Sequence, residues 1–241
     1  MARNRILTLV GAMVAGTLMA TAACAGSVNK SITIGDNTET GSESTVNGSI
    51  SVGTGATVNG SLTTVNGTIR IDGDSKTGDV ETVNGSIRIG SGTTVEDIDS
   101  VNGSIRLDEN VVVDGEISVV NGKITLERGT RVLDSVSNIN GEFRINGAEI
   151  GGDLSTVNGD VWLDDGSTVK GNLIVEKPGG WGFGNSNKRK PKIVIGPGSR
   201  VVGNIELERE VELFISDTAE VGGVTGEMDM DDAVRFSGNR P

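Results

Sequence analysis

A seven-residue phrase recurs along most of the chain and constrains its fold more than any other feature. Its clearest copy is Val83-Asn84-Gly85-Ser86-Ile87-Arg88-Ile89. One asparagine marks each copy, and successive markers lie 18 or 19 residues apart. The markers are Asn29, Asn47, Asn66, Asn84, Asn102, Asn121, Asn140 and Asn158. A fixed period of this length indicates one structural unit stacked on itself.

Within each repeat the apolar residues follow strand spacing. They occupy positions −1, +3 and +5 relative to the asparagine, as in Val101, Ile105 and Leu107. We expect these to point inward, because alternation with polar residues is typical of a half-buried strand. A second apolar pair follows further on, as in Val95 and Ile98. Glycine at 37 of 241 residues and the frequent Thr and Val disfavour helices.

These repeats predict an all-β fold: a single-domain, right-handed parallel β-helix (β-solenoid) of about ten coils of 18–19 residues. A coil this short cannot bury its own apolar side chains, whereas stacked coils bury them in continuous rows. Strands related by one coil then pair in parallel, about 4.8 Å apart. An antiparallel sandwich or barrel is the alternative, since a single Asn-Gly pair usually marks a hairpin.

The Asn-Gly pair predicts a corner of the coil. Glycine accepts positive φ freely, and asparagine tolerates it better than most residues. Asparagines at the same place in successive coils are also expected to pass amide hydrogen bonds along the stack.

The N-terminal residues 1–25 have the pattern of an export signal. Arg3 and Arg5 precede an apolar stretch over 6–20, and small residues follow. Cys24 is the only cysteine, so a disulfide within the chain is excluded. Its surroundings resemble a bacterial lipobox, which implies lipid attachment at Cys24. The alternative is ordinary cleavage at a neighbouring alanine. Either reading predicts export to the bacterial cell envelope (periplasm or outer membrane), with a membrane anchor if Cys24 carries lipid.

The predicted β-helix covers residues 27–225 and has irregular ends and one insertion. Thr40 and Glu43 stand where later coils have apolar residues, which indicates a polar cap on the first coil. Residues 177–191 interrupt the period, and such insertions form surface loops in repeat proteins. Residues 226–241 form an acidic C-terminal tail or cap.

Two sets of residues form the candidate ligand-binding surface. Position +4 of the repeat should stack arginines on an outer face, where they could grip a polyanion such as an acidic envelope glycan. The insertion adds aromatic and basic residues, a combination suited to a glycan or membrane surface. The candidates are Arg70, Arg88, Arg106, Arg144, Trp162, Trp181, Phe183, Lys188, Arg189 and Lys190. Each set has an alternative without a ligand. The arginine row could be a solvated strand face neutralised by nearby aspartates, and the insertion could fold back on its coil.

Composition weighs against several functions. A net charge of −12 argues against nucleic-acid partners. Histidine and tyrosine are absent, so we expect no enzymatic activity, no cofactor and no metal site. Carboxylate pairs, such as Asp97 with Asp99 or Asp72 with Asp74, leave a polysaccharide-active enzyme as a minor alternative.

Two repeats carry a family resemblance. Gly166-Ser-Thr-Val169-Lys-Gly171-Asn-Leu173 and Gly198-Ser-Arg-Val201-Val-Gly203-Asn-Ile205 resemble the repeat of bactofilins, polymer-forming bacterial cytoskeletal proteins. The Val-Asn-Gly-Ser-Ile phrase resembles bacterial putative-adhesin β-solenoids. The resemblance implies a repeat fold and either an adhesin-like scaffold or an end-to-end homo-oligomer. The export signal and the basic-aromatic insertion depart from the cytosolic bactofilin pattern.

Overall fold

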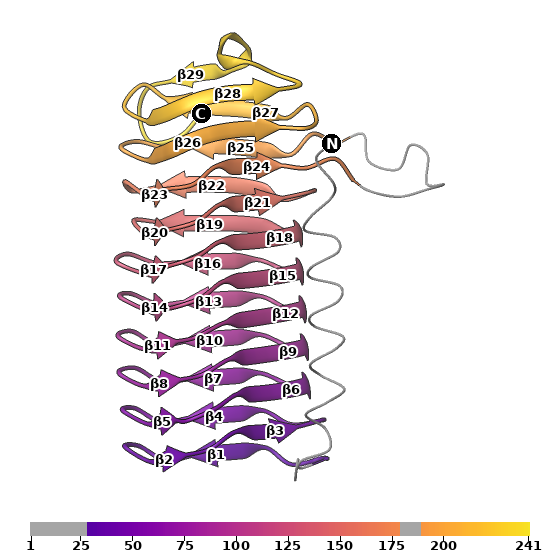
Figure 1. Cartoon of the computed structure of the whole chain (residues 1–241), viewed down its shortest axis with the longest axis vertical. Helices are drawn as coiled ribbons and strands as arrows, with labels where there is room; N and C mark the ends of the chain where they lie inside the picture. The colour runs from indigo at the N-terminus through magenta and orange to yellow at the C-terminus, as the bar shows by residue number, and fades with distance from the viewer. Residues whose placement is uncertain (1–27, 179–188) are drawn as a thin grey trace.

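The computed structural model describes residues 28–178 and 189–241, and in this part the chain forms a stack of parallel β-coils of about ten turns (Figure 1). All strand pairs are parallel, and each joins equivalent residues of neighbouring coils. The predicted all-β solenoid is therefore confirmed, and the antiparallel alternative is wrong.

One sheet runs along the whole stack and has eleven strands. They are β1 (Ile32–Ile34), β4 (Ile50–Val52), β7 (Ile69–Ile71), β10 (Ile87–Ile89), β13 (Ile105–Leu107), β16 (Ile124–Leu126), β19 (Glu142–Asn146), β22 (Asp160–Asp164), β25 (Lys192–Ile195), β27 (Glu212–Ser216) and β29 (Val234–Phe236). We call the outer side of this sheet the arginine face.

The second sheet has 18 strands in two ladders, which join at the C-terminal end. The first ladder contains β2 (Glu39–Thr40), β5 (Thr57–Val58), β8 (Lys76–Thr77), β11 (Thr94–Val95), β14 (Val112–Val113), β17 (Arg131–Val132), β20 (Glu149–Ile150) and β23 (Thr168–Val169). The second contains β3 (Glu43–Thr45), β6 (Leu62–Asn66), β9 (Val80–Asn84), β12 (Ile98–Asn102), β15 (Ile117–Asn121), β18 (Val136–Asn140), β21 (Leu154–Thr156) and β24 (Leu173–Val175). Both ladders continue into β26 (Arg200–Leu207), which pairs with β28 (Glu220–Gly226). We call the outer side of the second ladder the valine face.

Rows of aliphatic side chains fill the interior. In the long sheet, Ile105 and Leu107 point inward and Arg106 between them is exposed, as period-two alternation requires. In the second sheet, Val95 and Ile98 are fully buried. Both predicted inward positions of the long sheet and the predicted second apolar pair are thus confirmed.

The inward assignment of position −1 is wrong. Val101 is only half-buried and faces outward, whereas Ser100 before it is fully buried. Small polar residues hold this inward position in most coils, and some of them reach the corner, whereas Thr82 Oγ1 and Ser100 Oγ have no hydrogen-bond partner. Thr64 Oγ1 donates to the Gly48 carbonyl at 2.9 Å, and Asn138 Nδ2 donates to the Gly122 carbonyl at 2.7 Å.

The reason for the corner glycine also differs from the prediction. Of the glycines that follow the ladder asparagines, Gly141 alone has positive φ. The others are required by the neighbouring coil: a Cβ on Gly103 would lie 1.5 Å from the Gly85 carbonyl oxygen. Positive φ occurs instead at the turn after the long-sheet strands, as at Asp74 and Gly92.

The predicted asparagine ladder is confirmed. Each asparagine from Asn47 to Asn158 donates through Nδ2 to the Oδ1 atom of the preceding asparagine, at 2.8 to 3.1 Å. The last Oδ1, of Asn158, accepts a hydrogen bond from Arg209 Nη1 at 2.8 Å. Exposed amides are therefore paired along this corner of the stack.

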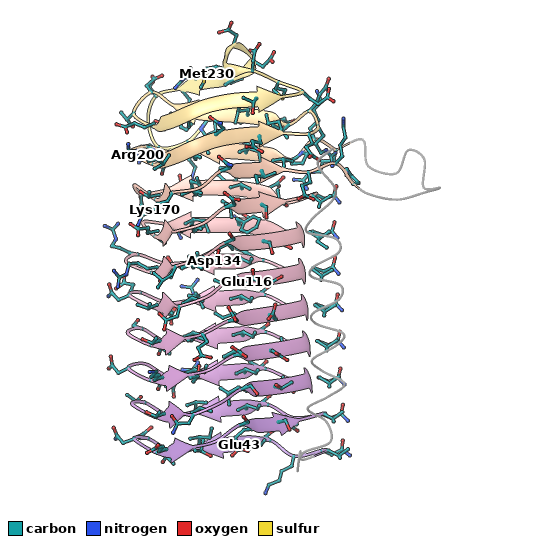
Figure 2. All side chains as sticks on the ribbon, viewed as in Figure 1. Glu43, Glu116, Asp134, Lys170, Arg200 and Met230 are labelled. Atoms are coloured by element: carbon teal, nitrogen blue, oxygen red, sulfur yellow. The ribbon has the colours of Figure 1, made fainter. Side chains whose placement is uncertain are left out.

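The two ends of the stack differ. At the N-terminal end, Thr40 and Glu43 hydrogen-bond to each other at 3.2 Å, at positions that are apolar in the next coil. At the other end, the 3₁₀ helix η1 (Met230–Asp232) and β29 follow the last long coil, and Met230 packs against the core. Figure 2 shows Glu43 and Met230 at these opposite ends. No described helix is long and apolar enough to cross a membrane.

Candidate ligand-binding surface

The arginine face carries the predicted arginine row. Arg70, Arg88 and Arg106 stand at the centre of β7, β10 and β13 and are directly in register. Thr125 takes the next place in the row and Arg144 follows it on β19. Neighbours in the row are one strand spacing apart, about 4.8 Å. The structure thus brings together the four arginines predicted for this row.

Carboxylates next to the row neutralise most of it. Arg70 Nε lies 2.9 Å from Asp72, and Arg144 Nε lies 2.6 Å from Glu142. Arg106 pairs with both Asp108 and Glu127, at 3.1 and 2.9 Å. These pairs are solvent-exposed, so each is worth at most about 1 kcal/mol and can open for a competing anion.

Arg88 differs from the other arginines of the row. Its coil has Gly90 where the flanking coils have Asp72 and Asp108. Among the described residues Arg88 has no ion-pair partner, although Arg70 and Arg106 lie on either side of it. The centre of the row therefore has the least compensated positive charge.

Aromatic residues continue the row toward the C-terminal end. Trp162 follows Arg144 in register, and Val194 and Phe214 come next. Lys192 Nζ lies 4.9 Å from the Trp162 ring centroid and 4.6 Å from that of Phe214, which is cation–π geometry. Val194 points outward yet is only 1 % exposed, between these side chains. Sequence reasoning missed Phe214 and Lys192, because the insertion separates them from Trp162 in the chain.

The residues at the base of the insertion are held by ion pairs. Arg189 binds the Asp160 carboxylate, and Lys190 Nζ lies 2.7 Å from Glu210. Arg209 Nη2 donates to the Arg189 carbonyl at 3.2 Å. These contacts fix where the chain re-enters the stack.

Four further predicted site residues lie outside the described residues. They are Cys24, Trp181, Phe183 and Lys188.

The carboxylates considered for catalysis make different local contacts. Asp72 pairs with Arg70, and Asp74 occupies a turn with φ 57°. Asp97 Oδ1 accepts a hydrogen bond from the Glu116 amide at 2.7 Å, a corner contact between coils. Asp99 lies instead on the valine face beside Glu81, which is its register partner on β9.

The valine face has an unusual electrostatic environment at these two residues. Burial raises the pKa of Asp99 to about 7, and the negative charges of neighbouring carboxylates add to the effect. Burial also raises the pKa of Glu81. No described group of three or more His, Cys, Asp or Glu residues is arranged to hold a metal ion.

Comparison with known proteins gives no relative for this chain. No protein-family model matches it, and no similar curated protein or solved structure was found. The solenoid fold therefore rests on the sequence repeat and the structure.

Proposed function

We propose that the protein is a non-enzymatic β-solenoid of the bacterial cell envelope, exported by its N-terminal signal and anchored by lipid at Cys24. It serves as an adhesin-like scaffold that holds an acidic envelope glycan, or a similar polyanion, along the arginine face. The resemblance to adhesin-type repeats supports this proposal.

The proposal rests on the side chain of Arg88, which has no ion-pair partner among the described residues. An exposed guanidinium without a carboxylate partner, between two further arginines in register, provides several donors to one linear anion. The row repeats at about 4.8 Å, close to the length of one sugar unit, so an extended chain could contact successive coils.

The test measures the affinity of a fluorescein-labelled heparin oligosaccharide for wild type and two variants by anisotropy. Arg88→Glu should weaken binding at least fivefold. Arg131→Glu is the matched control, because Arg131 is exposed on β17, away from the arginine face, and also has no described ion-pair partner. The control should stay within twofold of wild type. Equal losses in both variants, or no binding by wild type, would contradict the proposal.

A self-polymerising filament, as the bactofilin resemblance implies, is the second candidate. The observation that favours it is the N-terminal end, where β1, β2 and β3 each pair with the following coil alone among the described strands. Such edges add further strands readily. Light scattering and negative-stain microscopy would show filaments that shorten in Val28→Glu, since Val28 is exposed at this end. A wild-type protein that remains a monomeric rod would exclude the filament.

A further inference from the structure

The valine face carries an aliphatic row that coil geometry does not require. After the first coil, whose Val28 is exposed, seven consecutive coils place a β-branched residue at the outward position before the ladder asparagine, and all but the last are half-buried. They are Val46, Val65, Val83, Val101, Val120, Ile139 and Val157. The equivalent outward row of the arginine face holds Ser, Thr, Arg and Trp. Apolar residues that adjoin one another along an outer sheet face form a candidate protein-binding surface.

Two carboxylates accompany this row on the same face. Glu81 and Asp99 each lie two residues before a valine of the row, so period two places them on the same side of the sheet. Glu81 is 8 % exposed, and its Oε2 atom is buried without a hydrogen-bond partner. Neither carboxylate has an ion pair with a described Lys or Arg; the flanking row members Thr63 and Ser118 are neutral.

A cationic ligand group would satisfy this pair. Asp79, Asp97 and Glu116 add negative charge around Asp99, and a buried carboxylate without a partner is costly. An ammonium or guanidinium group next to the two carboxylates would supply both the opposite charge and the missing donor. The aliphatic row on the same face requires apolar groups in the same ligand.

We propose that the valine face binds an extended basic and apolar peptide segment of a partner protein. Its aliphatic side chains lie on the valine row, and one Lys or Arg side chain reaches Glu81 and Asp99. A second copy of this acidic chain would place carboxylates against carboxylates, and a simple polyamine has no apolar side chains for the row. This peptide site is separate from the arginine face and does not depend on the polyanion proposal.

The test uses the full chain and a labelled twelve-residue peptide of alternating Lys and Val, with binding followed by fluorescence anisotropy. Glu81→Gln/Asp99→Asn and Val83→Thr/Val101→Thr should each weaken binding at least tenfold. The charge control is Glu109→Gln/Asp165→Asn, because both carboxylates are exposed in the turns that follow β13 and β22 of the long sheet. It should change affinity less than twofold. A matching Lys-Ser peptide should bind at least tenfold more weakly.

The outcomes are decisive for the site. Equal losses in the charge control and in Glu81→Gln/Asp99→Asn would reduce the interaction to net charge and overturn the proposal. Unchanged binding in Val83→Thr/Val101→Thr, with circular dichroism showing folded protein, would overturn it as well. Wild-type affinity should also rise between pH 6 and pH 8 as Asp99 ionises beside Glu81, Asp79, Asp97 and Glu116. Asp99→Asn should flatten that profile, and an identical profile in the variant would contradict the assignment.

Discussion

The arginine face and the valine face meet at the asparagine ladder and differ in almost every outward residue. On one side the outward row is charged and largely neutralised by neighbouring carboxylates. On the other side the row is aliphatic, and two carboxylates beside it lack cationic partners among the described residues. The inward rows of both are similar, because stacking requires buried residues in each coil. Outward residues are free of that requirement, so we expect the two faces to bind different ligands if our proposals hold.

The largest expected effect on the free energy of unfolding comes from replacing Ile105, and Val101 on the other side of the corner serves as its comparison. Ile105→Ser removes a buried aliphatic side chain and places a hydroxyl in the core, so we expect a loss of about 4 kcal/mol. Val101→Ser changes an outward residue and should cost about 1 kcal/mol or less. Chemical denaturation of both variants checks the assignment. Similar losses would mean that Val101 also belongs to the core.

The corner itself should be nearly as sensitive. Gly103→Ala would place a Cβ 1.5 Å from the Gly85 carbonyl oxygen, so the two coils must separate there. We expect a loss of about 3 kcal/mol in the free energy of unfolding. Gly41→Ala is the control, since no atom lies within 4 Å of its Cβ position and its φ is not positive. If both variants lose the same free energy of unfolding, close contact between coils does not explain why glycine is needed at position 103.

A smaller, pH-dependent effect is expected on the valine face. The raised pKa of Asp99 means that its ionised form destabilises the fold, so wild type loses stability as pH rises from about 4, the usual pKa of an aspartate, to about 7. Asp99→Asn removes this loss. Its melting temperature should exceed that of wild type by several degrees at pH 8 and by much less at pH 4.5. A constant difference across this range would place Asp99 in an ordinary solvated environment.

The smallest expected effect concerns the asparagine ladder between the faces. Asn102→Ala removes one donated and one accepted amide hydrogen bond, for a loss of about 1 kcal/mol, since the ladder is exposed. Asn102→Asp keeps the acceptor for Asn121 and loses the donor to Asn84, so its loss should be about half as large. Thermal melts at neutral pH compare the two, and a larger loss in Asn102→Asp would contradict this division.

Much of the fold could be predicted because the repeat is regular. The spacing of the asparagines predicted the parallel stack and the amide ladder. The orientation of Val101 could not be predicted, because two adjacent positions of one strand compete for the core. The buried place went to Ser100, although its Oγ atom has no hydrogen-bond partner, whereas Thr64 at the same position of another coil donates to a corner carbonyl.

The candidate site was predicted only in part, for a related reason. In-register arginines and their pairs with Asp72 and Asp108 follow directly from the repeat, and Gly90 at the equivalent position leaves Arg88 as the exception. The pairs with Glu127 and Glu142 depend on side-chain reach and could not be predicted. The contact of Lys192 with Trp162 and Phe214 could be predicted only if the inserted residues were left out when the repeat positions were counted. Glu81 belongs to no sequence motif, and it is recognised as a candidate site residue only from its register with Asp99 and from its burial.

The most direct test of the two-face account uses one dye at two positions of the same coil. Ser51 precedes Arg70 in the arginine row, and Ser44 precedes Thr63 and Glu81 on the valine face; both serines are half-buried. Each is replaced by Cys in a Cys24→Ser background and labelled with an environment-sensitive fluorophore. Titration with the heparin oligosaccharide should change the emission at position 51 and leave position 44 unchanged. An equal response at both positions, or a response at position 44 alone, would contradict the account.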